Sequence, residues 1–172
     1  MQNDFVKLRA LEPADLRTLY RWENDMSIWD VGNVVNPLSQ AVLQAYIRSS
    51  HNNLYQDMQL RMMVDSLDGK TVGCVDLYDF EPRTLKAGIS LLIDKQYRGK
   101  GYAYQTMLML EHYAFDFLHL HQLYAFIPVN NKASISLFEK LGYQQSAVIK
   151  DWVLHGNTYD DVIVFQHINA EH

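Results

Sequence analysis

The sequence has a single cysteine, Cys74, in 172 residues. A lone thiol excludes an intramolecular disulfide and any metal cluster built on several thiolates. Such scarcity is typical of a reducing compartment, so we expect a cytoplasmic protein. His112 and His119 lie two helical turns apart, which is too far for simple chelation, so we expect no metal.

Long apolar runs are also lacking. No window approaches the roughly 18 uninterrupted apolar residues of a membrane-spanning helix. Residues 1–20 carry charges throughout, including Asp4, Lys7 and Arg17, where a secretory signal would be apolar. We therefore expect neither a membrane partner nor a signal peptide.

A basic surplus is missing as well, because the formal net charge is −5 at pH 7. Nucleic-acid binding neutralises phosphates with a basic face, so we expect no nucleic-acid partner. The acidic balance leaves room for a cationic partner, although simple solubility would explain the same balance.

The length and the composition, which is 48% hydrophobic and 20% charged, suit one globular domain. No repeat or linker interrupts the chain, so we expect a single domain over residues 1–172. Periodicity and turn residues predict an α+β fold with one mixed sheet. The expected strands cover residues 6–9, 59–64, 71–77, 85–93, 123–129, 147–154 and 159–165. The expected helices begin near Pro13, after Ser39 and after Gly101, and a fourth covers residues 131–141.

The most unusual stretch is residues 96–103 (QYRGKGYA), between a predicted strand and a predicted helix. It is no Walker loop, because Lys100 is followed by Gly101, and no dinucleotide fingerprint, because Tyr104 stands at the third glycine position. Its glycines would let consecutive N–H groups face one anion, and the helix N-terminus and Arg98 would add positive charge. A pyrophosphate suits this loop; the alternative is a tight turn that merely needs glycine.

This loop resembles the acetyl-CoA pyrophosphate loop of the GNAT superfamily of N-acetyltransferases. Residues 131–143 (NKASISLFEKLGY) resemble the second signature of the family, and residues 6–16 resemble its usual N-terminus. Within the superfamily the chain is most similar to spermidine acetyltransferases and ribosomal-protein N-terminal acetyltransferases.

The resemblance implies a splayed, mostly antiparallel mixed sheet of about seven strands, flanked by about four helices. Acetyl-CoA, the co-substrate, would lie between the strand ending at Ile93 and the strand ending at Val129, and Pro128 would weaken pairing where they part. The resemblance assigns cofactor binding to Leu91, Leu92, Ile93, Gln96, Arg98, Gly99, Lys100, Gly101, Tyr102, Ala103, Asn131, Ser134 and Phe138.

The implied reaction is direct attack of a primary amine on the thioester in a ternary complex. The acceptor could be a polyamine, a peptide or protein N-terminus, or a small amine, and a homo-oligomer stays open. The alternative is an acetyl-CoA-binding module or sensor without efficient turnover.

Two positions depart from the family pattern. Phe138 stands where the family often has a proton-donating Tyr, and Gly88 stands where many members have a Glu. Asp76, Asp79 and Glu81, on or just after the third strand, are the candidate bases, with Asp76 and Asp79 preferred. The alternative for Asp76 is an exposed strand carboxylate.

For the amine we expect Glu23, Trp29, Trp152 and Tyr159 to line the site, because acidic and aromatic side chains suit a cation. The alternative for the last two is a solvated hairpin.

Overall fold

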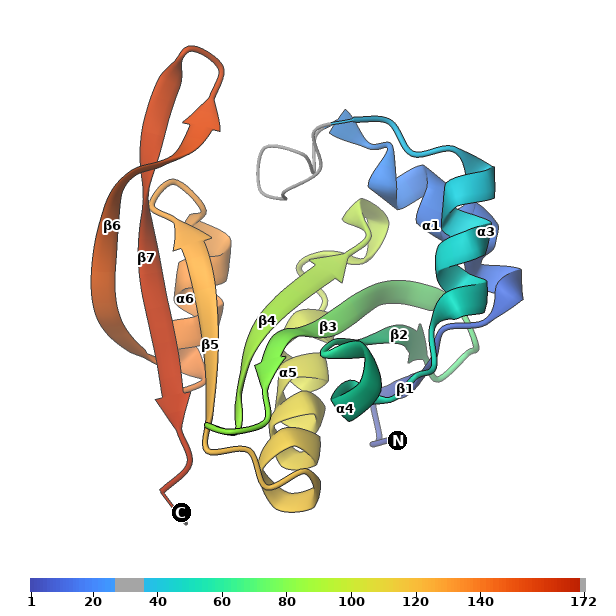
Figure 1. Cartoon of the computed structure of the whole chain (residues 1–172), viewed down its shortest axis with the longest axis horizontal. Helices are drawn as coiled ribbons and strands as arrows, with labels where there is room; N and C mark the ends of the chain where they lie inside the picture. The colour runs from blue at the N-terminus through green and yellow to red at the C-terminus, as the bar shows by residue number, and fades with distance from the viewer. Residues whose placement is uncertain (27–35, 171–172) are drawn as a thin grey trace.

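The computed structural model describes residues 1–26 and 36–170. Its centre is a seven-stranded sheet in the order β1-β2-β3-β4-β5-β7-β6 (Figure 1). Only β4 and β5 pair in parallel, which confirms the expected mixed α+β fold. The strands are β1 (Val6–Ala10), β2 (Leu60–Ser66), β3 (Thr71–Glu81), β4 (Lys86–Ile93), β5 (Gln122–Pro128), β6 (Gln144–His155) and β7 (Thr158–Ile168).

Five α-helices surround the sheet in the described part of the chain, where about four were expected. They are α1 (Leu16–Glu23), α3 (Gln40–Ser49), α4 (Leu54–Asp57), α5 (Tyr102–His112) and α6 (Lys132–Lys140). The helix missed from the sequence is α4, a single turn capped by Asn53 and too short to show a periodic pattern. Short turns η1 (Pro13–Asp15), η2 (Lys95–Tyr97) and the π-helical η3 (Tyr113–Phe117) complete the set.

The alternation of side chains along each strand divides the core between the two faces of the sheet. One face packs on α5 and α6, through residues such as Leu77, Leu110 and Phe138. The other face packs on α1 and α3, where Cys74 belongs to the buried cluster. Cys74 and Leu77 therefore lie on opposite faces of β3, as the alternation of side chains along a strand predicts for residues three apart.

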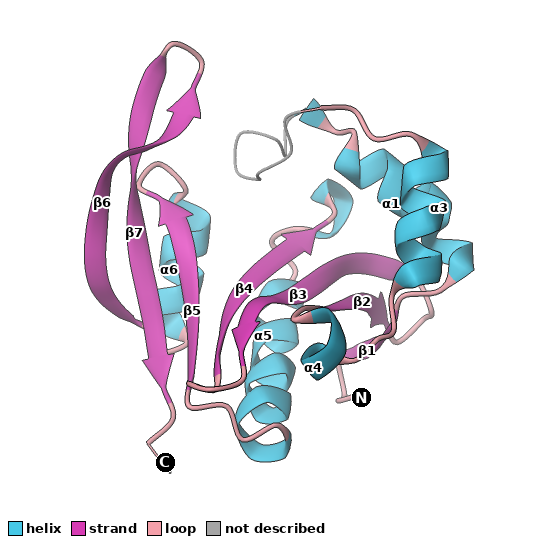
Figure 2. Cartoon of the chain, viewed as in Figure 1, coloured by secondary structure: helices cyan, strands magenta, loops and turns pink. Residues whose placement is uncertain are grey.

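β4 and β5 separate soon after they meet (Figure 2). They pair only over Lys86–Gly88 and Gln122–Tyr124. Beyond Tyr124, β5 follows β7 as far as Pro128, which still pairs with Val162. The expectation that Pro128 opens the sheet is therefore wrong. Each strand follows its antiparallel neighbour, and the twist of the sheet carries the two apart.

Candidate active site

The glycine loop leads directly into the N-terminus of α5. Gly99 and Gly101 have φ values of +71° and +86°, a left-handed conformation that favours glycine. Gly101 is the N-cap, and the first bond into the helix runs from the Gln105 N–H to the Gly101 carbonyl at 3.1 Å. The N–H groups of Tyr102 and Ala103 consequently have no intrahelical acceptor. This arrangement fits a pyrophosphate, whose oxygens accept such hydrogen bonds.

Side chains on either side of the glycines are held in place by the fold. Arg98 Nε donates to the Ile93 carbonyl at 3.0 Å, which ties the loop to the end of β4. Lys100 Nζ lies 5.6 Å from the centre of the Tyr97 ring. Gln96, Arg98 and Lys100 are all exposed, so their polar ends can reach a bound anion.

The residue that anchors this loop to α1 was not found from the sequence. Asp94 is buried, accepts hydrogen bonds from Trp22 Nε1 at 2.9 Å and from the Gln96 N–H, and pairs with Arg21 at 2.7 Å. Burial alone would raise the pKa of Asp94, but the hydrogen bonds from Trp22 and Gln96 and the charge of Arg21 bring it below its usual value. Only the position of Asp94 just before the loop could have signalled this role.

The open edge of β4 is available to the pantetheine arm. The Asp94 N–H donates to the Val72 carbonyl at 2.9 Å, on the β3 side. Because backbone groups alternate along a strand, those of Leu92 also face β3, whereas those of Leu91 and Ile93 face the gap left by β5. We therefore remove Leu92 from the expected arm-binding set and keep Leu91 and Ile93.

The second signature forms α6 and its cap. Asn131 Oδ1 accepts the Ser134 N–H at 3.1 Å, so this oxygen is used by the helix while the Asn131 amide nitrogen can still face the arm. Phe138 is only 5% exposed, and its ring packs on Tyr143 at 4.8 Å between centroids. Phe138 is thus a core residue here, and direct contact with the cofactor stays a prediction.

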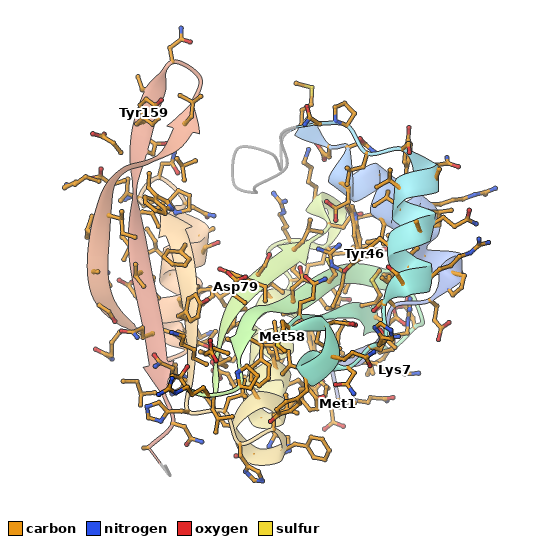
Figure 3. The ribbon with its side chains drawn as sticks, in the orientation of Figure 1. Met1, Lys7, Tyr46, Met58, Asp79 and Tyr159 are labelled. Atoms are coloured by element: carbon orange, nitrogen blue, oxygen red, sulfur yellow. The ribbon has the colours of Figure 1, made fainter. Side chains whose placement is uncertain are left out.

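Asp76 is engaged in a salt bridge. Arg61 Nε and Nη2 donate to its two carboxylate oxygens at 2.7 and 3.0 Å, and Arg61 Nη1 bonds Glu23 at 2.7 Å. Although burial alone would lower the pKa of Arg61, the charge of Asp76 helps to raise it well above its usual value. Tyr46 covers the same guanidinium at 5.7 Å (labelled in Figure 3). This geometry favours a structural role for Asp76 and Glu23.

Asp79 is placed differently. It is exposed near the end of β3, with φ at +47° where the register with β4 shifts (Figure 3). Among the described residues, no hydrogen bond or ion pair engages its carboxylate. Asp79 therefore remains the candidate base.

Three further residues were expected at the amine site. Trp29 lies outside the described residues. Trp152 and Tyr159 are 59% and 61% exposed on the β6–β7 hairpin, where Figure 3 shows Tyr159 near the tip. Their contact with an amine stays a prediction.

The described residues lack two kinds of feature. Their His, Cys, Asp and Glu side chains form no group of three or more that could hold a metal ion. None of their helices is long and apolar enough to cross a membrane.

Known proteins share this sequence and this fold. The model of the acetyltransferase (GNAT) domain family matches residues 6–144. The spermidine N(1)-acetyltransferase of Escherichia coli K12 is 28% identical over 97% of this chain and 90% of its own. The corresponding enzyme of Vibrio cholerae serotype O1 is 26% identical over 93% of this chain and 91% of its own.

The likeness extends to a solved structure. The crystal structure of spermidine N-acetyltransferase from Vibrio cholerae in complex with CoA and spermine matches with a TM-score of 0.87, at 23% identity and 96% coverage of both chains. This match shows the shared fold. The comparisons support acetyl transfer to an amine and give no support to a binding module without turnover. The family model spans most of the chain, which therefore belongs to the GNAT acetyltransferase family.

Proposed function

We propose that this enzyme transfers the acetyl group of acetyl-CoA to a terminal primary amine of a linear polyamine, in the cytoplasm. The observation that carries the cofactor assignment is the glycine loop, whose N–H groups face away from the helix beside the parted strands. The polyamine class rests on the named activity of the two curated relatives.

The open face of the sheet supports a cationic acceptor. Tyr78, Tyr124 and Phe126 stand next to one another there, with ring centroids 6.1 and 5.6 Å apart. Asp79 adds an exposed carboxylate. Aromatic faces and a carboxylate attract an ammonium group, while the methylene segments of a polyamine can cover the rings.

The proposed roles follow from these positions. The loop from Gln96 to Ala103 binds the pyrophosphate, and the backbone edge at Leu91 and Ile93 orients the arm. Asp79 accepts a proton from the attacking amine, which is needed because an alkylamine with a pKa near 10 is only about 0.1% neutral at pH 7. Acetyl-CoA supplies the activated acetyl group when it is bound.

The acceptor is tested by measuring free thiol release and acetylated product with pairs of amines. Diaminobutane and butylamine share the reacting group and differ only by a second cationic end. We expect spermidine and diaminobutane to give at least a tenfold higher kcat/KM than butylamine. A higher kcat/KM for an N-terminal peptide than for any polyamine would contradict the proposed acceptor.

A further inference from the structure

The ring of Tyr78 occupies the volume that a side chain at residue 88 would fill. A Cβ atom built on Gly88 would lie 2.5 Å from Cε2 and Cζ of Tyr78. This ring position and a larger side chain at residue 88 therefore exclude each other. Because Cζ carries the hydroxyl, the phenol oxygen lies over β4 at the last residue that pairs with β5.

Tyr78 lies beside the point where β4 and β5 part. Tyr78 pairs with Gly88 across β3 and β4, and Gly88 pairs with Tyr124 across β4 and β5, so the three residues share one face of the sheet. That face is opposite to the one covered by α5, because the alternate residue Leu77 belongs to the α5 side. An amine that reaches the parted strands from this face meets the phenol.

The phenol is also in the right protonation state to act as a donor. Burial, with further contributions from Tyr124 and Asp79, raises the pKa of Tyr78 to about 12. The hydroxyl stays protonated at neutral pH and can give a proton but not accept one. Asp79 is close enough to affect the titration of both tyrosines, since it also raises the pKa of Tyr124, after burial.

We propose that Tyr78 is the proton donor of the transfer reaction and that it takes the place of the tyrosine missing at Phe138. This role for Tyr78 rests on the proposed acetyl transfer from acetyl-CoA to an amine. The nitrogen–carbon bond forms and the carbon–sulfur bond breaks, while Tyr78 gives its proton to the sulfur. Asp79 passes the first proton of the ammonium group to water before attack. It then takes the second proton that the nitrogen loses and returns it to the Tyr78 oxygen, so that Tyr78 is protonated and Asp79 is ionised again.

Replacing Tyr78 with phenylalanine keeps the ring over Gly88 and removes only the hydroxyl. We expect kcat to fall about 100-fold, at the low end for a general acid because a thiolate leaves readily, with little change in KM. Tyr55→Phe is the matched control. Like Tyr78, Tyr55 packs edge-on against another aromatic ring, that of Phe80, but it belongs to α4 and has no proposed role in the reaction. Its kcat should equal that of the wild type.

A fluorinated tyrosine at position 78 separates proton donation from packing. Fluorine makes the phenol more acidic, so the alkaline fall in kcat should move to lower pH, which a merely structural ring would not cause. The fluorine resonance should also shift when coenzyme A binds, and this readout needs no turnover. Gly88→Ala should push the ring aside and lower kcat without removing any hydroxyl.

Three results would overturn the proposal. The first is a kcat for Tyr78→Phe within threefold of the wild-type value, and the second is an alkaline fall in kcat that fluorotyrosine leaves at the same pH. The third is a fluorine resonance that does not shift at saturating coenzyme A. The assay uses whichever amine turns over best. If polyamines fail and another amine is acetylated, the acceptor assignment fails while the test of Tyr78 proceeds.

Discussion

Trp22 Nε1 donates a hydrogen bond of 2.9 Å to Asp94 Oδ2, and this buried contact joins α1 to the start of the cofactor loop. Removing the donor by Trp22→Phe takes away a buried hydrogen bond to a charged group and leaves Arg21 as the remaining partner of Asp94 Oδ2. We expect a loss of about 1–3 kcal/mol in the free energy of unfolding, together with weaker coenzyme A binding. Urea denaturation and calorimetric titration measure the two effects.

Asp94 also predicts a pH dependence. Its folded pKa is lowered, so its contribution to stability is present above the unfolded pKa and is lost as the pH falls through the folded value. Asp94→Asn should therefore be less stable than the wild type at neutral pH, and the difference should shrink at acidic pH. If the free energies of unfolding of Asp94→Asn and the wild type differed by the same amount at every pH from 3 to 7, this role would be contradicted.

Asp76→Asn should affect stability more than chemistry. The change removes the negative charge that pairs with Nε and Nη2 of Arg61, leaving Glu23 at Nη1 as the remaining carboxylate partner. We expect a loss of about 1–3 kcal/mol in the free energy of unfolding. Asp79→Asn is the matched control. It should lower kcat and leave the midpoint of urea denaturation unchanged. A normal midpoint with lost turnover in Asp76→Asn would restore Asp76 as the base.

Phe138→Tyr is expected to restore the family residue without restoring its role. The ring at this position is buried against Tyr143 and Phe165, so a hydroxyl there would be desolvated. We predict lower stability, by about 1–3 kcal/mol, and no gain in kcat. A faster variant with an unchanged unfolding midpoint would show that position 138 reaches the thioester.

Glu111 makes the stability of the fold depend on pH in the opposite direction to Asp94. Burial raises its pKa from 4.5 to about 7, although the nearby hydroxyl of Tyr143 lowers it in part. The protonated form is favoured in the fold, so this stabilisation is present at low pH and is lost as the pH rises through about 7. Glu111→Gln should gain stability over the wild type at pH 8 relative to pH 5.

His167 must be included in that comparison. Its Nδ1 lies 3.6 Å from Glu111 Oε1, and burial lowers its pKa, so its own contribution is lost as the pH falls below the usual 6.5. The variant is therefore compared with the wild type at each pH. If the free energies of unfolding of Glu111→Gln and the wild type differed by the same amount at pH 5 and pH 8, Glu111 would be ionised at both pH values.

The sequence sufficed for the parts of this protein that local patterns determine. Residues 96–103 and 131–143 have fixed spacings that place the loop and α6, and alternation along β3 assigned Cys74 and Leu77 to opposite faces. The contacts of Asp76 and Asp94 could not be predicted, because Arg61 and Trp22 come from distant segments. Likewise, Gly88 departs from the family pattern in the sequence, but only the folded sheet shows that the Tyr78 ring fills the space beside it.

The central claim, that the glycine loop binds the pyrophosphate of acetyl-CoA, is tested most directly by titrating coenzyme A into Gly99→Glu and Gly69→Glu. Both glycines have positive φ, +71° and +79°, and neither has an atom within 4 Å of a built Cβ. The two variants thus carry the same backbone strain, while only Gly99 lies in the loop. We predict that Gly99→Glu weakens binding at least 100-fold and that Gly69→Glu binds like the wild type. Equal affinities for the two variants would contradict the account.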